Sequence, residues 1–300
     1  MKIAVSGLFN IEMNANIHSF PIPYEPVCFN FFGVQTGISG VGYNVTMALH
    51  TLGAQVVPIA FLGTDLAGEM IHRELTKKGI ETFHVHQILK ETPMSSILYD
   101  ASGKRRIECD LKDIQEKDMI ERMEKNPLEG VDGLVAGTVN FSRRFLLKAL
   151  ETKIPIFVDC HVLSDVYDSY HRDFLNSADV LFLSNEKIPT SSFEFLESLK
   201  MRTKASIIVI GEGENGASIF VRSENSFTHQ EAFINPNTVN TIGAGDALFS
   251  SFVYFFLKTS NPHESLRKAQ FFASKKIEFS GGANGFLSEV ELNDRLRGIR

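Results

Sequence analysis

Short apolar runs alternate along the chain with longer segments that carry apolar residues at helical spacing. Most of the runs are continuously apolar, which is typical of strands buried on both faces of a sheet. The predicted strands are Lys2–Ser6, Val56–Leu62, Gly133–Ala136, Ile154–Asp159, Val180–Leu183 and Ile207–Ile210. The predicted helices are Tyr43–Leu52, Gly68–Lys78, Arg143–Glu151, Asp165–Asn176, Ser192–Met201, Gly245–Lys258 and His263–Phe279. This alternation predicts an α/β fold with a mostly parallel sheet and helices on both faces.

Two segments, about 10–32 and 94–110, interrupt the alternation and contain strand and turn signals without helices. The second segment has strand-forming residues on both sides of Gly103, which predicts a hairpin. Together the segments predict a small β-sheet that projects as a lid, with an ordinary edge hairpin as the alternative. We expect one domain over residues 1–300. An exposed edge of the small sheet could pair with a second copy, so a homodimer is one expectation.

Composition narrows the class of protein. The 300 residues are 43% hydrophobic and 22% charged, which is ordinary for a globular protein and excludes disordered and fibrous classes. The net charge of −6 leaves no basic excess for binding nucleic acid. The three cysteines form no metal or disulfide pattern, which indicates a reducing, cytoplasmic compartment. No apolar run approaches 18 residues, so we expect neither a signal peptide nor a membrane span.

The most informative segment is 237–249, Asn-Thr-Val-Asn-Thr-Ile-Gly-Ala-Gly-Asp-Ala-Leu-Phe. Its small residues at 243–245 allow the backbone to approach a ligand closely, and an apolar helix follows at once. The N–H groups of a first helical turn have no partner within the helix, and the helix dipole favours an anion beside them. Asp246 lies in that turn, where it either complements the dipole or acts as a general base beside an anion site.

This segment resembles the C-terminal signature of the ribokinase-like carbohydrate kinase family, also called the phosphofructokinase B type. The family pattern is approximately Asp-Thr-x-Gly-Ala-Gly-Asp-x-Phe, and Asn240 stands at its first position. The resemblance implies a three-layer ribokinase-like core and transfer of the ATP γ-phosphate, with Mg²⁺, to a hydroxyl of a sugar, nucleoside or related molecule. It also implies that Asp246 is the base. The amides of the anion hole would come from Gly243, Ala244 and Gly245.

The N-terminal part resembles the substrate side of the same family. Segment 37–54 resembles the family's Gly-rich turn, Asn, helix and Leu-Gly-Ala, and segment 7–13 resembles its Gly-x-x-Asn-x-Asp. The residues that would hold the acceptor hydroxyls are Asn10, Glu12, Gly40 and Asn44. Glu12 stands where the family has Asp, which suggests a different or smaller acceptor.

A dinucleotide fingerprint is the rival interpretation of the Gly-rich turn. Gly40 and Gly42 have the right spacing, but Val45 occupies the third glycine position and no acidic residue follows until Asp65. The rival, a dinucleotide oxidoreductase, is therefore disfavoured.

Further matches concern the nucleotide. The residues that the resemblance assigns to it are Asn185, Gly211, Gly216, Thr241 and Gly282. Ile188 occupies the position of the family Glu that helps to organise Mg²⁺. Glu186 could take the role of that Glu, although its carboxylate would approach the metal from a different direction. In some members the closing loop, here 279–284, binds a monovalent cation, and the sequence leaves open whether this one does. The metal ligands stay unassigned.

Two smaller groups stay open. The hairpin cations Lys104, Arg105 and Arg106 are either solvated charges or a clamp on an anionic substrate. Asp159 and His161 end a predicted strand, where ligands gather in α/β sheets, but the sequence does not single them out. Because of the departures at Glu12, Ile188 and Asn240, a ligand-binding regulator on a kinase fold is the alternative to a kinase.

Overall fold

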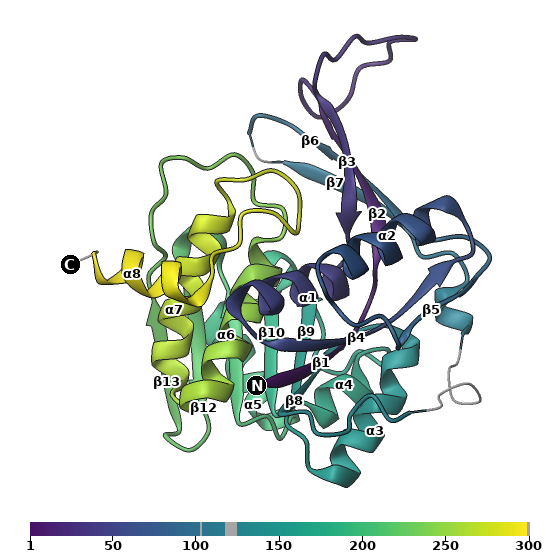
Figure 1. The fold of residues 1–300 in the computed structure, drawn as a ribbon. Coiled ribbons are helices and arrows are strands. Elements are labelled where there is room, and N and C mark those ends of the chain that lie inside the picture. Colours follow the sequence, from purple (N-terminus) through teal and green to yellow (C-terminus); the bar gives the residue numbers. More distant parts are fainter. Residues whose placement is uncertain (103, 118–124, 299–300) are drawn as a thin grey trace.

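A nine-stranded, mostly parallel sheet forms the centre of the protein (Figure 1). The computed structural model describes residues 1–102, 104–117 and 125–298. The strand order is β13-β12-β11-β10-β9-β8-β1-β4-β5, parallel from β11 to β5 and antiparallel at β12 and β13. The strands are β1 (Lys2–Ser6), β4 (Gln55–Gly63), β5 (Val85–Leu89), β8 (Gly133–Gly137), β9 (Ile156–Val162), β10 (Val180–Ser184), β11 (Ile207–Gly211), β12 (Ala217–Val221) and β13 (Ser226–Gln230).

Helices cover both faces of this sheet and give three layers. Ile3 and Val5 of β1 belong to one apolar core, and Ala4 between them belongs to the other, as the two-residue period of a strand requires. The first core lies under α1 (Val41–Leu52), α2 (Leu66–Lys77), α6 (Ala244–Thr259), α7 (Pro262–Lys276) and α8 (Glu289–Arg297). The second lies under α3 (Arg143–Thr152), α4 (Arg172–Ser177) and α5 (Ser192–Arg202). The predicted α/β architecture is confirmed.

The predicted elements recur with shifted ends. Every predicted strand belongs to the large sheet, but the one expected from Ile154 begins at Ile156. The Ile154 N–H instead donates to the carbonyl of Ala149, within the closing turn of α3, where Lys153 is left-handed. No helix in the described part of the chain is long and apolar enough to cross a membrane.

The helix predicted over Asp165–Asn176 is wrong in its first half, because α4 begins only at Arg172. The Asp165 carboxylate accepts the N–H of Tyr167 at 2.8 Å, and Asp168 accepts the N–H of His171 at 3.0 Å. Such local bonds from aspartate to the backbone compete with a helical ladder, so the segment forms turns.

A separate four-stranded sheet projects from the large one (Figure 1). Its order is β3-β2-β6-β7, and its strands are β2 (Asn10–Asn16), β3 (Val34–Ser39), β6 (Met94–Tyr99) and β7 (Arg105–Asp110). The hairpin predicted in 94–110 is confirmed as β6 and β7, although Gly103 lies outside the described residues. Strand β7 is a fully exposed edge, and pairing of that edge with a second copy stays a prediction.

The first predicted segment of this sheet, 10–32, has the wrong extent. Only residues 10–16 of it form a strand, and the partner strand β3 begins after it, at Val34. The connecting residues 17–33 form a long loop that extends away from the rest of the molecule (Figure 1). Phe29, Phe31 and Phe32 in this loop are each at least 80% exposed, so these apolar residues do not belong to a buried strand.

Three-residue helical turns complete the fold. They are η1 (Ile114–Glu116), η3 (Asn140–Ser142), η4 (Asn185–Lys187) and η5 (Gly213–Asn215).

Candidate active site

The N-terminus of α6 is built from residues that leave room for a ligand. Gly243 precedes the helix with φ 76°, a left-handed conformation that favours glycine. A Cβ on Gly243 would lie 2.5 Å from the carbonyl oxygen of Gly282, so the two backbones approach each other too closely for any side chain. Gly245 is exposed, and apart from its chain neighbours and the backbone of its own helix, no described residue has an atom within 4 Å of the position that its Cβ would take. Ala244 donates its N–H to the Thr241 carbonyl at 3.1 Å, so this one of the three predicted donors is already engaged.

Asp246 follows in the first turn of α6 and contacts a residue from the other end of the chain. Asn44 of α1 donates its side-chain N–H to the Asp246 carboxylate, with 2.7 Å between Nδ2 and Oδ2. Burial raises the pKa of Asp246, and the charges of Asp159 and Glu12 act in the same direction. The Asn44 hydrogen bond and the nearby His161 lower that pKa and so favour the ionised form. The structure therefore joins the two predicted halves of the site at one carboxylate.

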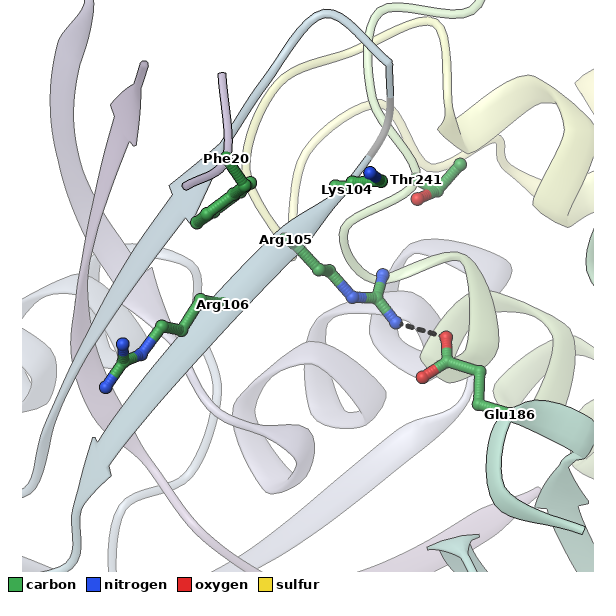
Figure 2. A pocket seen from close by; sticks show the side chains of 6 residues that line it. All are labelled: Phe20, Lys104, Arg105, Arg106, Glu186 and Thr241. Atoms are coloured by element: carbon green, nitrogen blue, oxygen red, sulfur yellow. Dashed lines mark hydrogen bonds and ion pairs between the residues drawn. The ribbon is translucent and has the colours of Figure 1, made fainter. Parts of the chain in front are cut away.

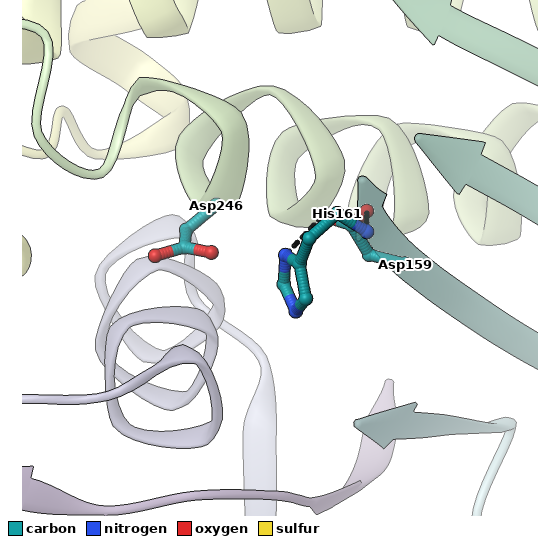
Figure 3. A group of neighbouring side chains, drawn as sticks. All are labelled: Asp159, His161 and Asp246. Atoms are coloured by element: carbon teal, nitrogen blue, oxygen red, sulfur yellow. Dashed lines mark hydrogen bonds and ion pairs between the residues drawn. The ribbon is translucent and has the colours of Figure 1, made fainter. Parts of the chain in front are cut away.

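Asp159 and His161, at the end of β9, lie beside Asp246 (Figure 3). One donor atom from each of the three residues lies within 4.8 Å of the other two. His161 has φ 58°, and its N–H donates to the Asp159 carboxylate at 2.8 Å. The sequence placed the pair only at a strand end. The sequence does not show which helix N-terminus packs against the end of β9, so it could not predict that this pair lies beside Asp246.

The predicted acceptor side of the site is formed by side chains of β2 and α1. Asn10 and Glu12 are buried on β2, where Asn10 donates to Ser95 Oγ at 2.7 Å and Asn14 donates to Glu12 Oε1 at 2.9 Å. The side-chain oxygens of Asn10 and Asn14 are buried and have no hydrogen-bond partner among the described residues. A buried polar atom without a partner is costly, so a donor from a bound hydroxyl would stabilise this region.

Gly40 caps the start of α1 and closes the acceptor side. It has φ 95°, and a Cβ there would lie 2.5 Å from the carbonyl oxygen of Leu8. The structure thus brings Gly40 next to the segment that leads into β2, where the resemblance places the acceptor.

The residues predicted to bind the nucleotide lie in different local environments. Asn185 is exposed in η4. Gly211 ends β11, where a Cβ would lie 3.6 Å from Leu248 of α6, an ordinary contact distance. Gly216 has φ 101°, and its missing Cβ would lie 2.1 Å from the carbonyl oxygen of Gln230. Close packing of the β12–β13 backbone therefore already explains this glycine. Ile188, at the position of the family Glu, is half-buried against the apolar core.

A cleft of about 480 Å³ lies between the small sheet and the α6 loop (Figure 2). Its lining residues are Phe20, Lys104, Arg105, Arg106, Glu186 and Thr241. Arg105 crosses from β7 to the core, and its Nη2 lies 2.6 Å from Glu186 Oε1. Arg106 points elsewhere and pairs with Glu108 of its own strand. The Glu186 carboxylate is therefore already paired with the guanidinium of Arg105 in the small sheet.

The features fit a nucleotide phosphate with a divalent ion. The cleft supplies Lys104, Arg105 and exposed Thr241, and Gly245 supplies open backbone. Asp159 and Asp246 supply carboxylates, and Mg²⁺ prefers oxygen ligands of this kind.

Comparison with known proteins gives one consistent result. The sequence matches the pfkB family carbohydrate kinase over residues 1–289. A deoxyribokinase of Salmonella typhi is 21% identical over 315 aligned residues, which cover 99% of each chain. The structure resembles the microbiome-derived acarbose kinase Mak1 with a TM-score of 0.87 at 20% identity, covering 99% of this chain and 98% of that one. It also resembles Arabidopsis thaliana ribokinase complexed with ribose and ATP, with a TM-score of 0.80 at 18% identity and 98% of each chain covered.

Proposed function

The chain belongs to the pfkB family of carbohydrate kinases, and we propose that it transfers the γ-phosphate of ATP to a hydroxyl of a sugar or related small molecule. One observation carries the proposal. The Asn44–Asp246 hydrogen bond places the residue expected to hold the acceptor directly on the carboxylate expected to remove its proton. The same carboxylate lies in the first turn of α6, and the N–H groups and dipole of a helix N-terminus favour an anion there.

In this mechanism the acceptor lies against Asn10, Glu12, Gly40 and Asn44. Asp246 takes the proton of the reacting hydroxyl. Burial raises the pKa of Asp246, and the Asn44 hydrogen bond and the nearby His161 oppose that rise by favouring the ionised form. Backbone around Gly243 and Gly245 faces the transferred phosphoryl group, where positioning and charge stabilisation dominate the chemistry.

Mg²⁺ would neutralise phosphate charge, and Asp159 is the carboxylate beside Asp246 that would hold it. Thr241, Asn185 and Gly211 lie on the nucleotide side. Gly282 joins them there and also packs against the acceptor residue Asn44, because a Cβ on Gly282 would lie 2.6 Å from Asn44 Nδ2. The small sheet acts as a lid whose Arg105 reaches the core and helps to exclude water from the phosphates.

A ligand-binding regulator is the second candidate, favoured by one observation. Ile188 packs into the core where the family has a carboxylate, and Glu186 is paired with Arg105 rather than directed at a metal. If these losses abolish turnover, ATP would still bind at the α6 turn.

The test is ADP release from Mg·ATP with sugars, sugar phosphates and nucleosides as acceptors, with Asp246→Asn measured in parallel. We expect turnover on one acceptor class and a kcat lower by roughly 10² to 10⁴ in the variant, because the base is lost. ATP binding without turnover on any acceptor would favour the regulator. If the variant keeps a near-normal kcat, Asp246 is not the general base.

Stability serves as the control for that variant. The folded pKa of Asp246 is raised above its ordinary value, so ionising this group weakens the fold as pH rises through the folded pKa. Asp246→Asn removes that cost and keeps an acceptor for Asn44. We therefore expect its unfolding temperature at pH 7 to equal or exceed that of the wild type, which shows that lost activity is not lost structure.

A further inference from the structure

Lys276, the last residue of α7, is fully buried, which is rare for lysine. Its ammonium donates hydrogen bonds to three backbone carbonyls. They belong to Ile242, to Gly281 at 2.6 Å and to Phe279 at 3.4 Å. Burying a charge is costly unless it is paired and hydrogen-bonded, so this arrangement needs a reason beyond packing.

The carbonyls come from the two loops that shape the phosphate side. Ile242 directly precedes Gly243 and the α6 turn, whereas Phe279 and Gly281 lead into Gly282. These loops touch where a Cβ on Gly243 would meet the Gly282 oxygen at 2.5 Å. A Cβ on Gly282 would in turn meet Asn44 Nδ2 at 2.6 Å, and Asn44 holds Asp246. The ammonium therefore bonds to both loops beside the contact that leads through Asn44 to Asp246.

The charges around Lys276 agree with a cation at this point. Converging carbonyl oxygens carry partial negative charge, and the carboxylates of Asp246 and Glu12 both favour the charged ammonium. Burial opposes them and lowers the pKa of Lys276 to about 8. The side chain is thus still mostly protonated at neutral pH.

We propose that Lys276 is a positioning residue whose ammonium is the built-in cation joining the anion-hole loop to the 279–282 turn. Three carbonyls around one point form the kind of site that a dissolved monovalent cation would take, and here the chain fills it. The inference rests on the proposed kinase function for its activity readout. It predicts that catalysis needs no dissolved monovalent cation.

The first measurement uses the wild type, with turnover compared in potassium, sodium and choline chloride at equal ionic strength. We expect equal kcat in all three salts. A kcat several-fold higher in potassium than in choline would overturn the proposal, because the site would then need a dissolved ion. This arm requires no variant to fold.

The second measurement removes the ammonium. Lys276→Ala deletes a propylammonium-sized group, and Lys276→Met keeps an apolar stem without charge. We expect kcat to fall roughly 10- to 100-fold in both, with a smaller change in acceptor KM, because a displaced base misaligns the reacting groups. Added propylammonium should restore kcat in Lys276→Ala and not in Lys276→Met.

Lys275→Met is the matched control. Lys275 is the neighbouring lysine of α7, and it pairs with Glu278 at 2.8 Å without contacting either loop. We expect its kcat to stay within about twofold of wild type, since partly exposed ion pairs contribute little. Normal kcat in Lys276→Met, or an equal loss in Lys275→Met, would overturn the positioning role.

A readout without turnover separates this inference from the proposed function. Propylammonium should raise the unfolding temperature of Lys276→Ala and leave that of the wild type unchanged, by linkage of binding to folding. If no acceptor is turned over but this stabilisation occurs, the kinase assignment fails and the built-in cation stands. If the kinase works but propylammonium neither stabilises nor rescues Lys276→Ala, the inference fails.

Discussion

The phosphate side and the acceptor side of the site are made of different material. The phosphate side consists mainly of backbone, with Gly243 and Gly282 packed so closely that neither accepts a side chain. The acceptor side consists of buried side chains, Asn10, Glu12 and Asn44, each of which is hydrogen-bonded to another side chain of the small sheet or of α6. Backbone binds any phosphate in the same way, whereas side chains select the acceptor. We therefore infer that the departure from the family pattern at Glu12, on the acceptor side, bears on substrate choice.

The difference between the two sides is tested most strongly by two alanine substitutions in the α6 turn, Gly245→Ala and Gly243→Ala. Gly245→Ala adds a methyl group in open space at a helical position, so the free energy of unfolding should rise by up to about 1 kcal/mol. We expect kcat/KM to fall roughly 100-fold nonetheless, because the methyl group enters the phosphate space.

Gly243→Ala is the counterpart at the same turn. It adds strain at φ 76° and a 2.5 Å contact with Gly282, so stability should fall by about 1–3 kcal/mol. Urea unfolding and ADP release measured on both variants test the pair. If Gly245→Ala leaves activity intact, Gly245 does not face the phosphate.

Glu12→Gln tests the acceptor side. The variant keeps the size of the side chain and removes its charge, and one charged hydrogen bond contributes about 1.5–3 kcal/mol. We expect acceptor KM to rise roughly 10- to 100-fold while the KM for ATP stays near the wild-type value. A parallel rise in both constants would contradict the division into two sides.

The pH profile sharpens the link between the two sides. Asp246 must be ionised to act as base, so kcat/KM should fall as pH falls through its folded pKa, which burial holds above the ordinary value. Asn44→Ala removes a hydrogen bond that lowers this pKa, so the acid limb should move to higher pH. Ser39→Ala, which removes a donor to Asn44 but no contact with Asp246, should leave the limb in place.

The smallest effects are expected at the cleft of Figure 2. Arg105 is paired with Glu186, and both side chains are partly exposed, so the pair itself contributes about 1 kcal/mol or less. If Arg105 binds phosphate, Arg105→Ala should raise the KM for ATP a few-fold, whereas Glu186→Gln, which releases Arg105, should lower it. Changes in the same direction would show that the pair only joins the small sheet to the core.

Local patterns predicted most of the fold, and they failed where local and distant contacts compete. Strand β1 was predicted at its observed ends because a short, continuous apolar run is typical of a strand that is buried on both faces. The helix expected from Asp165 was shortened by two aspartates that bond to the nearby backbone. Of the predicted segment 10–32, only residues 10–16 form a strand, and the exposed aromatic residues that follow lie in the loop 17–33.

By itself the sequence determined the elements, the family resemblance and the Gly-Ala-Gly-Asp turn, because each depends on residues close together in the chain. Only the tertiary structure decided which distant groups meet. It placed Asn44 on Asp246, 202 positions away, brought Asp159 and His161 to the same carboxylate, and buried Lys276 among carbonyls of two loops. Such contacts depend on how helices pack across a sheet, and residue spacing along one chain carries no measure of that packing.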